Sequence, residues 1–181
     1  SVKNVCVSCG GSTSAKPEHV ALAERLGTAI AARGWGMVYG GANSGLMGAS
    51  ARATLAAGGQ VIGVLPDTLI SRELALPGLT KMIRTASMTE RKVVMTALSD
   101  AFVVLPGGYG TLDEMFEMVT YAQLGIHDKP LVCIDGGSGF FTHLRAFIER
   151  AATDGVVRPG HVELVRWAST PDEGLDALGL S

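Results

Sequence analysis

The sequence has few cysteines and few charged residues for its length. Three cysteines in 181 residues cannot form the disulfide framework of a small secreted domain, so we expect a reducing, cytoplasmic location. Charged residues make up 18% and hydrophobic residues 47%, which excludes an intrinsically disordered chain. The formal net charge of −2 lacks the positive excess typical of nucleic-acid and anionic-membrane binding, so we expect neither partner.

Long hydrophobic runs are also missing. Gly, Arg or Asp interrupts each apolar stretch well short of the ~20 residues that a membrane-spanning helix needs. No basic segment followed by an apolar one opens the sequence, so we expect no secretory signal. No linker or internal repeat divides the chain, which predicts a single domain over residues 1–181.

Glycine, in contrast, is abundant. It accounts for 24 of 181 residues, whereas an average protein has roughly 7% glycine. The glycines follow apolar runs in clusters: Gly10-Gly11, Gly40-Gly41, Gly107-Gly108 with Gly110, and Gly136-Gly137. Because glycine permits tight turns and close approach of the backbone to a ligand, these clusters indicate binding loops.

Short apolar runs alternate with longer amphipathic stretches. Predicted strands are Val2–Ser8, Gly36–Tyr39, Gln60–Leu65, Ala101–Leu105 and Pro130–Ile134, with a weaker candidate at Lys81–Thr85. Predicted helices are Pro17–Arg33, Leu46–Ala57, Met88–Leu98, Thr111–Leu124, Phe140–Asp154 and Pro171–Leu178. This alternation predicts a Rossmann-like α/β fold, a doubly wound parallel sheet with helices on both faces and ligands beyond the carboxyl ends of the strands.

Three glycine loops compete as phosphate sites, and two of them directly precede predicted helices. The Gly40–Gly45 loop fits neither G-x-G-x-x-G nor the P-loop, because Leu46 stands where a P-loop lysine is needed. The loop from Pro106 to Thr111 contains three glycines. The N–H groups of Gly108, Gly110 and Thr111 would converge at a helix N-terminus, a site for a phosphate monoester. The alternative for this segment is a capping box, with Thr111 as N-cap and Glu114 as its carboxylate partner.

A second helix start lies at Ser87-Met88-Thr89-Glu90-Arg91-Lys92, where Ser87 and Glu90 can form a capping box. Arg91 and Lys92 then fall near the positive end of the helix dipole, where cations are mildly unfavourable. This placement indicates a bound anion or a nearby carboxylate, or else a simple solvated basic pair.

Other reactive residues give weaker patterns. Cys6 and Cys9 have C-x-x-C spacing but no second cysteine pair for a zinc site, so we expect buried thiols. The four histidines show no ligand spacing, and no G-x-S-x-G nucleophile elbow occurs. We therefore expect no metal.

Taken together, the motifs resemble the LOG (LONELY GUY) family of cytokinin riboside 5′-monophosphate phosphoribohydrolases, often mislabelled lysine decarboxylases. The resemblance rests on Pro106-Gly107-Gly108-x-Gly110-Thr111-x-x-Glu114 with Arg91-Lys92 upstream, and it extends over nearly the whole chain. It implies hydrolysis of the N-glycosidic bond of a nucleoside 5′-monophosphate without a cofactor. It also implies a homodimer in which the adjacent subunit often completes the pocket.

By position in the family motifs, Arg91 and Glu114 would be the catalytic pair. The residues that the resemblance places against the nucleotide are Glu73, Arg91, Lys92, Gly108, Tyr109, Gly110, Thr111, Leu112, Asp113, Glu114 and Thr120, with Gly10 and Gly41 as further loop candidates.

The sequence departs from the family pattern at three positions, none of them in the proposed catalytic pair. Gly11 stands where many members have Ser, Ala42 replaces a third glycine, and Thr89 replaces a common His. The alternative function is a non-catalytic carrier of a nucleotide or phosphorylated cofactor, which need not keep both Arg91 and Glu114. A true lysine decarboxylase is disfavoured because neither Lys92 nor Lys129 has surroundings that resemble a pyridoxal phosphate site.

Overall fold

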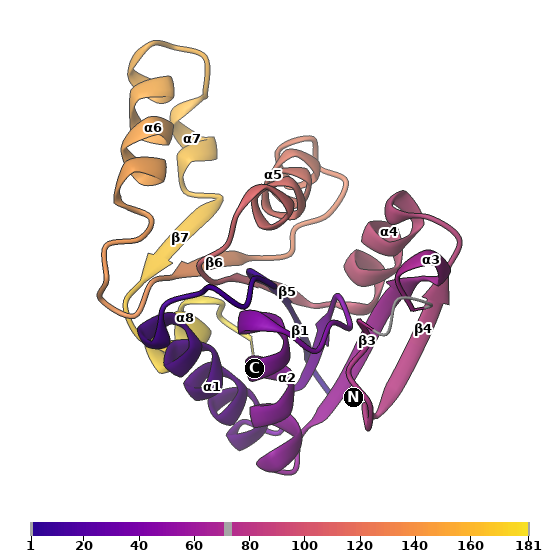
Figure 1. Cartoon of the computed structure of the whole chain (residues 1–181). Helices are drawn as coiled ribbons and strands as arrows, with labels where there is room; N and C mark the ends of the chain where they lie inside the picture. Colours follow the sequence, from indigo (N-terminus) through magenta and orange to yellow (C-terminus); the bar gives the residue numbers. More distant parts are fainter. Residues whose placement is uncertain (1, 71–73, 181) are drawn as a thin grey trace.

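The computed structural model describes residues 2–70 and 74–180, which form one parallel sheet of seven strands (Figure 1). The strand order is β4-β3-β2-β1-β5-β6-β7, and every neighbouring pair is parallel. The strands are β1 (Asn4–Ser8), β2 (Gly36–Tyr39), β3 (Gln60–Pro66), β4 (Lys81–Thr85), β5 (Ala101–Val104), β6 (Leu131–Ile134) and β7 (Val165–Ala168). The predicted Rossmann-like fold is confirmed.

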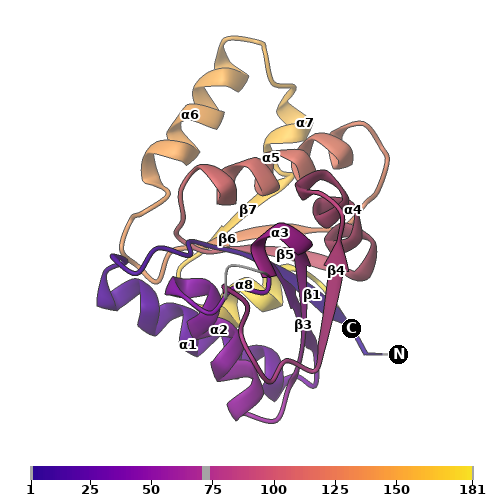
Figure 2. The ribbon, with the colours of Figure 1, turned by 45° about the vertical axis from the view of Figure 1, so that its right-hand side comes forward.

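Helices cover both faces of the sheet (Figures 1 and 2). One face carries α1 (Pro17–Ala32), α2 (Gly45–Ala56) and α8 (Pro171–Ala177), and the other carries α4 (Met88–Leu98), α5 (Tyr109–Gln123) and α6 (Thr142–Thr153). Two short helices, α3 (Asp67–Ile70) and α7 (Pro159–Val162), complete the order. Among residues 2–70 and 74–180, no helix is both long and apolar enough to cross a bilayer.

Side chains on the central strands alternate between two hydrophobic cores. On β1, Val5 and Val7 pack toward α1 and α2, whereas Cys6 packs toward α4 and α5. All of these side chains are at most 1% exposed, as expected for parallel strands covered on both faces. Ser8 therefore lies on the face of β1 that carries α4 and α5.

The direction of winding reverses between β1 and β5. From β1 the sheet continues through β2, β3 and β4 on one side and through β5, β6 and β7 on the other. At such a switch point the loops after the two central strands diverge and leave a crevice at their carboxyl ends. The segments that begin at Cys9 and Leu105 thus flank the predicted ligand site.

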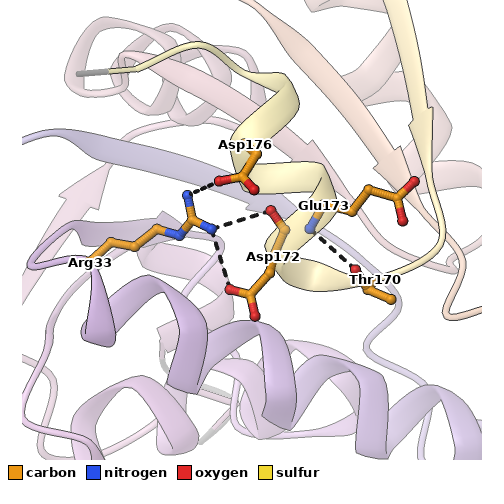
Figure 3. Close-up of polar contacts among 5 residues, drawn as sticks. All are labelled: Arg33, Thr170, Asp172, Glu173 and Asp176. Atoms are coloured by element: carbon orange, nitrogen blue, oxygen red, sulfur yellow. Dashed lines mark hydrogen bonds and ion pairs between the residues drawn. The ribbon is translucent and has the colours of Figure 1, made fainter.

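The last helix, α8, is held against α1 by an arginine at the end of α1 (Figure 3). Arg33 Nη1 contacts Asp176 Oδ1 at 2.8 Å, and Nη2 donates to the carbonyl of Asp172 at 3.2 Å. Thr170 caps α8 by accepting the N–H of Glu173. These contacts place the C-terminal segment on the face of the sheet opposite α4 and α5.

Strand β7 and the short helices α3 and α7 are not among the predicted elements. Strand β7 lies at the sheet edge, and only Val165 of its four residues is buried, so the segment lacks the apolar run of a central strand. Helices α3 and α7 have four residues each, too few for a hydrophobic period. The predicted start of the helix at Thr111 is wrong by two residues, because α5 begins at Tyr109.

Candidate active site

A cavity of about 230 Å³ opens at the carboxyl ends of the central strands. Three glycine-containing loops and the first turns of α4 and α5 surround it. The lining residues are Val7, Cys9, Gly10, Gly11, Gly40, Met47, Met88, Arg91, Lys92, Gly108, Gly110, Thr111, Asp113 and Glu114. The cavity thus lies where the fold predicts a ligand.

The loop between β5 and α5 presents free donors to this cavity. The first backbone bond of α5 runs from the N–H of Leu112 to the carbonyl of Gly108. No acceptor in the described part of the chain binds the N–H groups of Tyr109, Gly110 and Thr111. A Cβ at Gly108 or Gly110 would meet nothing within 4 Å, so both glycines border open space.

The capping-box interpretation of this loop is wrong. The N-cap of α5 is Gly108, and no side chain caps the helix. Thr111 is buried inside the first turn, and the Glu114 carboxylate binds Ser8 instead of the backbone. By contrast, the predicted cap of α4 is confirmed, because Ser87 Oγ accepts the N–H of Glu90 at 3.1 Å.

The competing loop between β2 and α2 has a structural role. The N–H groups of Leu46 and Met47, in the first turn of α2, both donate to the carbonyl of Gly10, at 2.9 and 3.2 Å. These donors are therefore not free for a phosphate. Gly41 adopts φ +78° and is not among the cavity residues, whereas its neighbour Gly40 is.

Arg91 lies in the first turn of α4, and only 6% of it is exposed. Its Nε donates to the carbonyl of Val64 at 2.9 Å, and its Nη2 donates to the carbonyl of Gly40 at 2.7 Å. Burial lowers the pKa of the guanidinium and the nearby Glu114 opposes that shift, but arginine remains charged in proteins. The solvated-pair interpretation is therefore wrong for Arg91.

Glu114 lies one turn into α5, across the cavity from α4. Its Oε2 accepts a hydrogen bond of 2.7 Å from Ser8 Oγ, and Oε1 has no partner in the described part of the chain. Burial raises the pKa of the Glu114 carboxyl, whereas the Ser8 hydrogen bond and Arg91 lower it. The effect of burial is larger, so the pKa is raised. Such a carboxylate is a stronger base than an exposed one.

Lys92 is bound by carboxylates of α5. Its Nζ lies 3.2 Å from Asp113 Oδ2 and 3.3 Å from Glu117 Oε1. Burial lowers the pKa of Lys92, but the bonds to these two carboxylates outweigh it, so the pKa is raised. Lys129 donates to the carbonyl of Thr96 and does not line the cavity. Neither lysine is a free amine.

The three cysteines are free and buried, which confirms the prediction made for Cys6 and Cys9. Cys9 lines the cavity, and burial raises the pKa values of the Cys6 and Cys9 thiols well above their ordinary range. Residues 2–70 and 74–180 contain no group of three or more His, Cys, Asp or Glu side chains that could hold a metal ion.

Most of the predicted site residues line the cavity, but some lie elsewhere. The predicted residues at the cavity are Gly10, Arg91, Lys92, Gly108, Gly110, Thr111, Asp113 and Glu114. Tyr109, Leu112 and Thr120 instead border a shallow groove on the outer side of α5, and Glu73 lies outside the described residues.

Four residues of the site are not among the predicted site residues. Gly40, Met47 and Met88 line the cavity, and Ser8 binds Glu114. Ser8 could have been found as a polar residue at the carboxyl end of an apolar strand. Gly40 could have been found in its glycine cluster. The two methionines carry no signal of their own.

The chain is similar to known proteins over most of its length. A protein-family model described as "possible lysine decarboxylase" matches residues 47–178. The chain is 43% identical over 170 residues to a rice protein (Oryza sativa subsp. japonica), named as the probable cytokinin riboside 5′-monophosphate phosphoribohydrolase LOGL9. This match covers 94% of the chain and 74% of the rice protein. The chain belongs to the LOG family.

A second LOG relative and a solved structure extend the comparison. The Arabidopsis thaliana cytokinin riboside 5′-monophosphate phosphoribohydrolase LOG1 is 43% identical over 157 residues, which cover 87% of this chain and 73% of LOG1. The molybdenum cofactor binding protein of the phototrophic bacterium Rippkaea orientalis superposes with a TM-score of 0.76 at 22% identity, covering 99% of this chain and 96% of that one. The second likeness concerns the fold alone.

Proposed function

We propose that this LOG-family protein hydrolyses the N-glycosidic bond of N6-prenylated adenosine 5′-monophosphate. The products would be the free cytokinin base and ribose 5-phosphate. The observation that carries the proposal is that Arg91, Glu114 and the unpaired N–H groups of Gly110 and Thr111 border one cavity. The LOG relatives, by their names, act on this class of substrate.

The 5′-phosphate would bind at the N-terminus of α5. Three unpaired N–H groups and the positive end of the helix dipole favour a phosphate monoester there. Because the phosphate does not react, its binding energy can orient the ribose toward the catalytic groups. Gly108 and Gly110 leave room for this close approach.

Glu114 would act at the anomeric carbon of the ribose. It lies three residues beyond Thr111, about 4.5 Å along the helix axis, so it faces the sugar when the phosphate is bound at the first turn. Cleavage of the glycosidic bond develops positive charge on the sugar, which an ionised carboxylate stabilises. The unpaired Oε1 would accept a proton from the attacking water.

Arg91 would contact the substrate through its remaining N–H groups. Two of its donors are bound to the carbonyls of Val64 and Gly40, which fixes the plane of the guanidinium. Within the described residues, the Nη1 group has only the weak acceptor Sδ of Met88, at 3.8 Å. Its N–H groups can therefore orient the ribose hydroxyls or the leaving base.

The test is chromatography of the purified protein incubated with N6-isopentenyl-adenosine monophosphate, scored for free base and ribose 5-phosphate. AMP is assayed in parallel. Release of base from the prenylated substrate in clear preference to AMP is the expected result. Equal cleavage would mean a broader nucleoside monophosphate hydrolase. Binding of both nucleotides without cleavage would contradict the proposal and favour a carrier.

The variant Glu114→Gln tests the assignment of the carboxylate. We expect turnover to be abolished while nucleotide affinity stays within about tenfold, or ~1.4 kcal/mol, because the phosphate contacts remain. A matched control is Glu149→Gln on α6, which removes an exposed carboxylate paired with Arg145. Loss of binding and folding together in Glu114→Gln would instead indicate a structural role.

We also infer a homodimer that covers the groove on the outer side of α5. The groove contains Tyr109, which is 97% exposed, together with Phe116 and Thr120. A second copy bound there would bury these side chains. It would also bring Thr120 of one subunit toward the cavity of the other. Sedimentation equilibrium tests this inference, and a monomer at micromolar concentration would contradict it. A reducing, cytoplasmic location stays a prediction, supported by the three free cysteines.

A further inference from the structure

We propose that Ser8 is a positioning residue, whose hydroxyl orients the Glu114 carboxylate for the reaction. This inference rests on the proposed hydrolase function. It concerns a residue of the central strand that does not itself line the cavity. The link is a single side-chain hydrogen bond between residues 106 positions apart in the sequence, Ser8 Oγ to Glu114 Oε2 at 2.7 Å.

The position of Ser8 in the sheet makes this hydroxyl available. Ser8 is the last residue of β1 and is paired in register with Val104 of β5. Its carbonyl accepts the N–H of Leu105, so the backbone is engaged in the sheet and only the side chain turns toward α5. Ser8 is 2% exposed, and its hydroxyl makes no other hydrogen bond within the described part of the chain.

The bond to Ser8 is the only direct polar contact of the Glu114 carboxylate in the described part of the chain. Arg91 acts on Glu114 through space but forms no ion pair with it within 4.0 Å, as judged over residues 2–70 and 74–180. A hydrogen bond to Oε2 restrains the position of that oxygen and leaves Oε1 free for water or sugar. Catalytic groups must be held to within about 0.5 Å of the productive geometry, and here one hydroxyl provides that restraint.

The same bond favours the ionised form of Glu114. Three charged groups act on this carboxyl: Arg91 and Lys92 of α4 and Asp113 of α5. The carboxylate in turn raises the pKa values of the Cys6 thiol in β1 and of the Cys9 thiol just after it. Among these contacts, the Ser8 hydrogen bond and the two cations lower the pKa of Glu114, whereas burial and Asp113 raise it. Removing the hydroxyl therefore raises the pKa of Glu114 further.

The test compares Ser8→Ala with wild type in the cleavage of N6-isopentenyl-adenosine monophosphate. We expect kcat to fall about ten- to a hundredfold, the effect of one hydrogen bond to a charged group, while KM stays within about threefold. The acidic limb of the kcat–pH profile should move to higher pH, since the reaction needs ionised Glu114. Ser8→Thr keeps the hydroxyl and should restore most of kcat, and Ser8→Cys, a weaker donor, should behave like Ser8→Ala.

Ser99→Ala is the matched control. Ser99 is also buried, 3% exposed, and its hydroxyl donates to the carbonyl of Met95 at the end of α4, away from the cavity. This variant should lower thermal stability without moving the pH profile. An equal fall of kcat in both serine variants, or an unchanged pH profile in Ser8→Ala, would overturn the inference.

A second measurement separates this inference from the proposed function. The measurement is NMR of protein labelled with ¹³C at the glutamate carboxyl. The Glu114 resonance is assigned by its loss in Glu114→Gln. It should titrate at higher pH in Ser8→Ala than in wild type. This readout needs no substrate. If the wild type cleaves nothing, the proposed function fails. If it cleaves and Ser8→Ala leaves both kcat and the titration unchanged, only the role of Ser8 fails.

Discussion

Replacing Gly40 by Ala should inactivate the protein without unfolding it. Gly40 follows β2, and its carbonyl accepts the hydrogen bond from Arg91 Nη2. Its φ is not positive, so the backbone tolerates an alanine there. A Cβ at this position, however, would lie 1.8 Å from Arg91 Nη2 and 2.9 Å from Arg91 Cζ. The substitution therefore acts on the guanidinium of Arg91, the proposed catalytic arginine, and not on the local turn.

The size of the effect follows from these distances. Cβ contacts shorter than 3.0 Å essentially never occur, so the guanidinium must move by more than 1 Å. A misplacement of about 1 Å can reduce catalysis about a hundredfold. Breaking the bond to the Gly40 carbonyl costs about 1.5–3 kcal/mol, well below the roughly 5–15 kcal/mol that keep a domain folded. Met47 Cε, at 2.6 Å, can also move aside because its side chain is flexible.

Initial rates with N6-isopentenyl-adenosine monophosphate, combined with thermal melting, test this prediction. We expect kcat/KM to fall at least about a hundredfold while the melting transition stays cooperative. Gly160→Ala is the control, because a Cβ on that residue of α7 would meet nothing within 4 Å. If Gly40→Ala is folded and keeps kcat/KM within about threefold of wild type, the position of the Arg91 guanidinium beside Gly40 is not needed for activity, and the prediction is refuted.

Two further predictions concern stability and thiol chemistry. Burial raises the pKa of Glu114 in the native state above the ordinary value of 4.5. Protonation of Glu114 therefore contributes to the free energy of unfolding. This contribution is complete below pH 4.5 and is lost as the pH rises through the native pKa. In urea titrations, the unfolding free energy of Glu114→Gln should therefore rise relative to that of wild type as the pH increases above 4.5. A difference that does not depend on pH would contradict this prediction. Burial also raises the pKa of the Cys133 thiol to about 12, and it raises the pKa values of the Cys6 and Cys9 thiols. A disulfide reagent at pH 8 should therefore label these three thiols only after denaturation, and rapid labelling of the native protein would argue against their burial.

The central part of the fold could be predicted from the sequence because its elements have strong local signals. Strands such as β2 and β5 are buried at every position, so they appear as apolar runs bounded by glycine. The edge strand β7 has no such signal, since exposed positions need not be apolar. The sequence predicts a doubly wound parallel sheet but not the order of its strands, in which β1 lies between β2 and β5. Strand order depends on pairing between segments that are distant in the sequence.

The candidate site could be predicted only in part, for a related reason. The glycine loop and the pair Arg91 and Glu114 lie in local motifs that resemble a known family. The carbonyls that hold Arg91 come from the ends of β2 and β3, and the hydroxyl that holds Glu114 comes from the end of β1. Such contacts arise from tertiary packing, which one sequence does not encode in any local pattern.

These contacts give the site a consistent construction. Each of the two proposed catalytic side chains begins in the first turns of a helix, and atoms at the ends of neighbouring strands bind its functional group. Arg91 of α4 is bound to the carbonyls of Val64 and Gly40, and Glu114 of α5 is bound to Ser8. The first turn of α5 also has N–H groups that no acceptor in the described residues binds, and these are the proposed phosphate donors. Because the strands form the rigid centre of the sheet, small substitutions at Ser8 or Gly40 should change catalysis far more than stability.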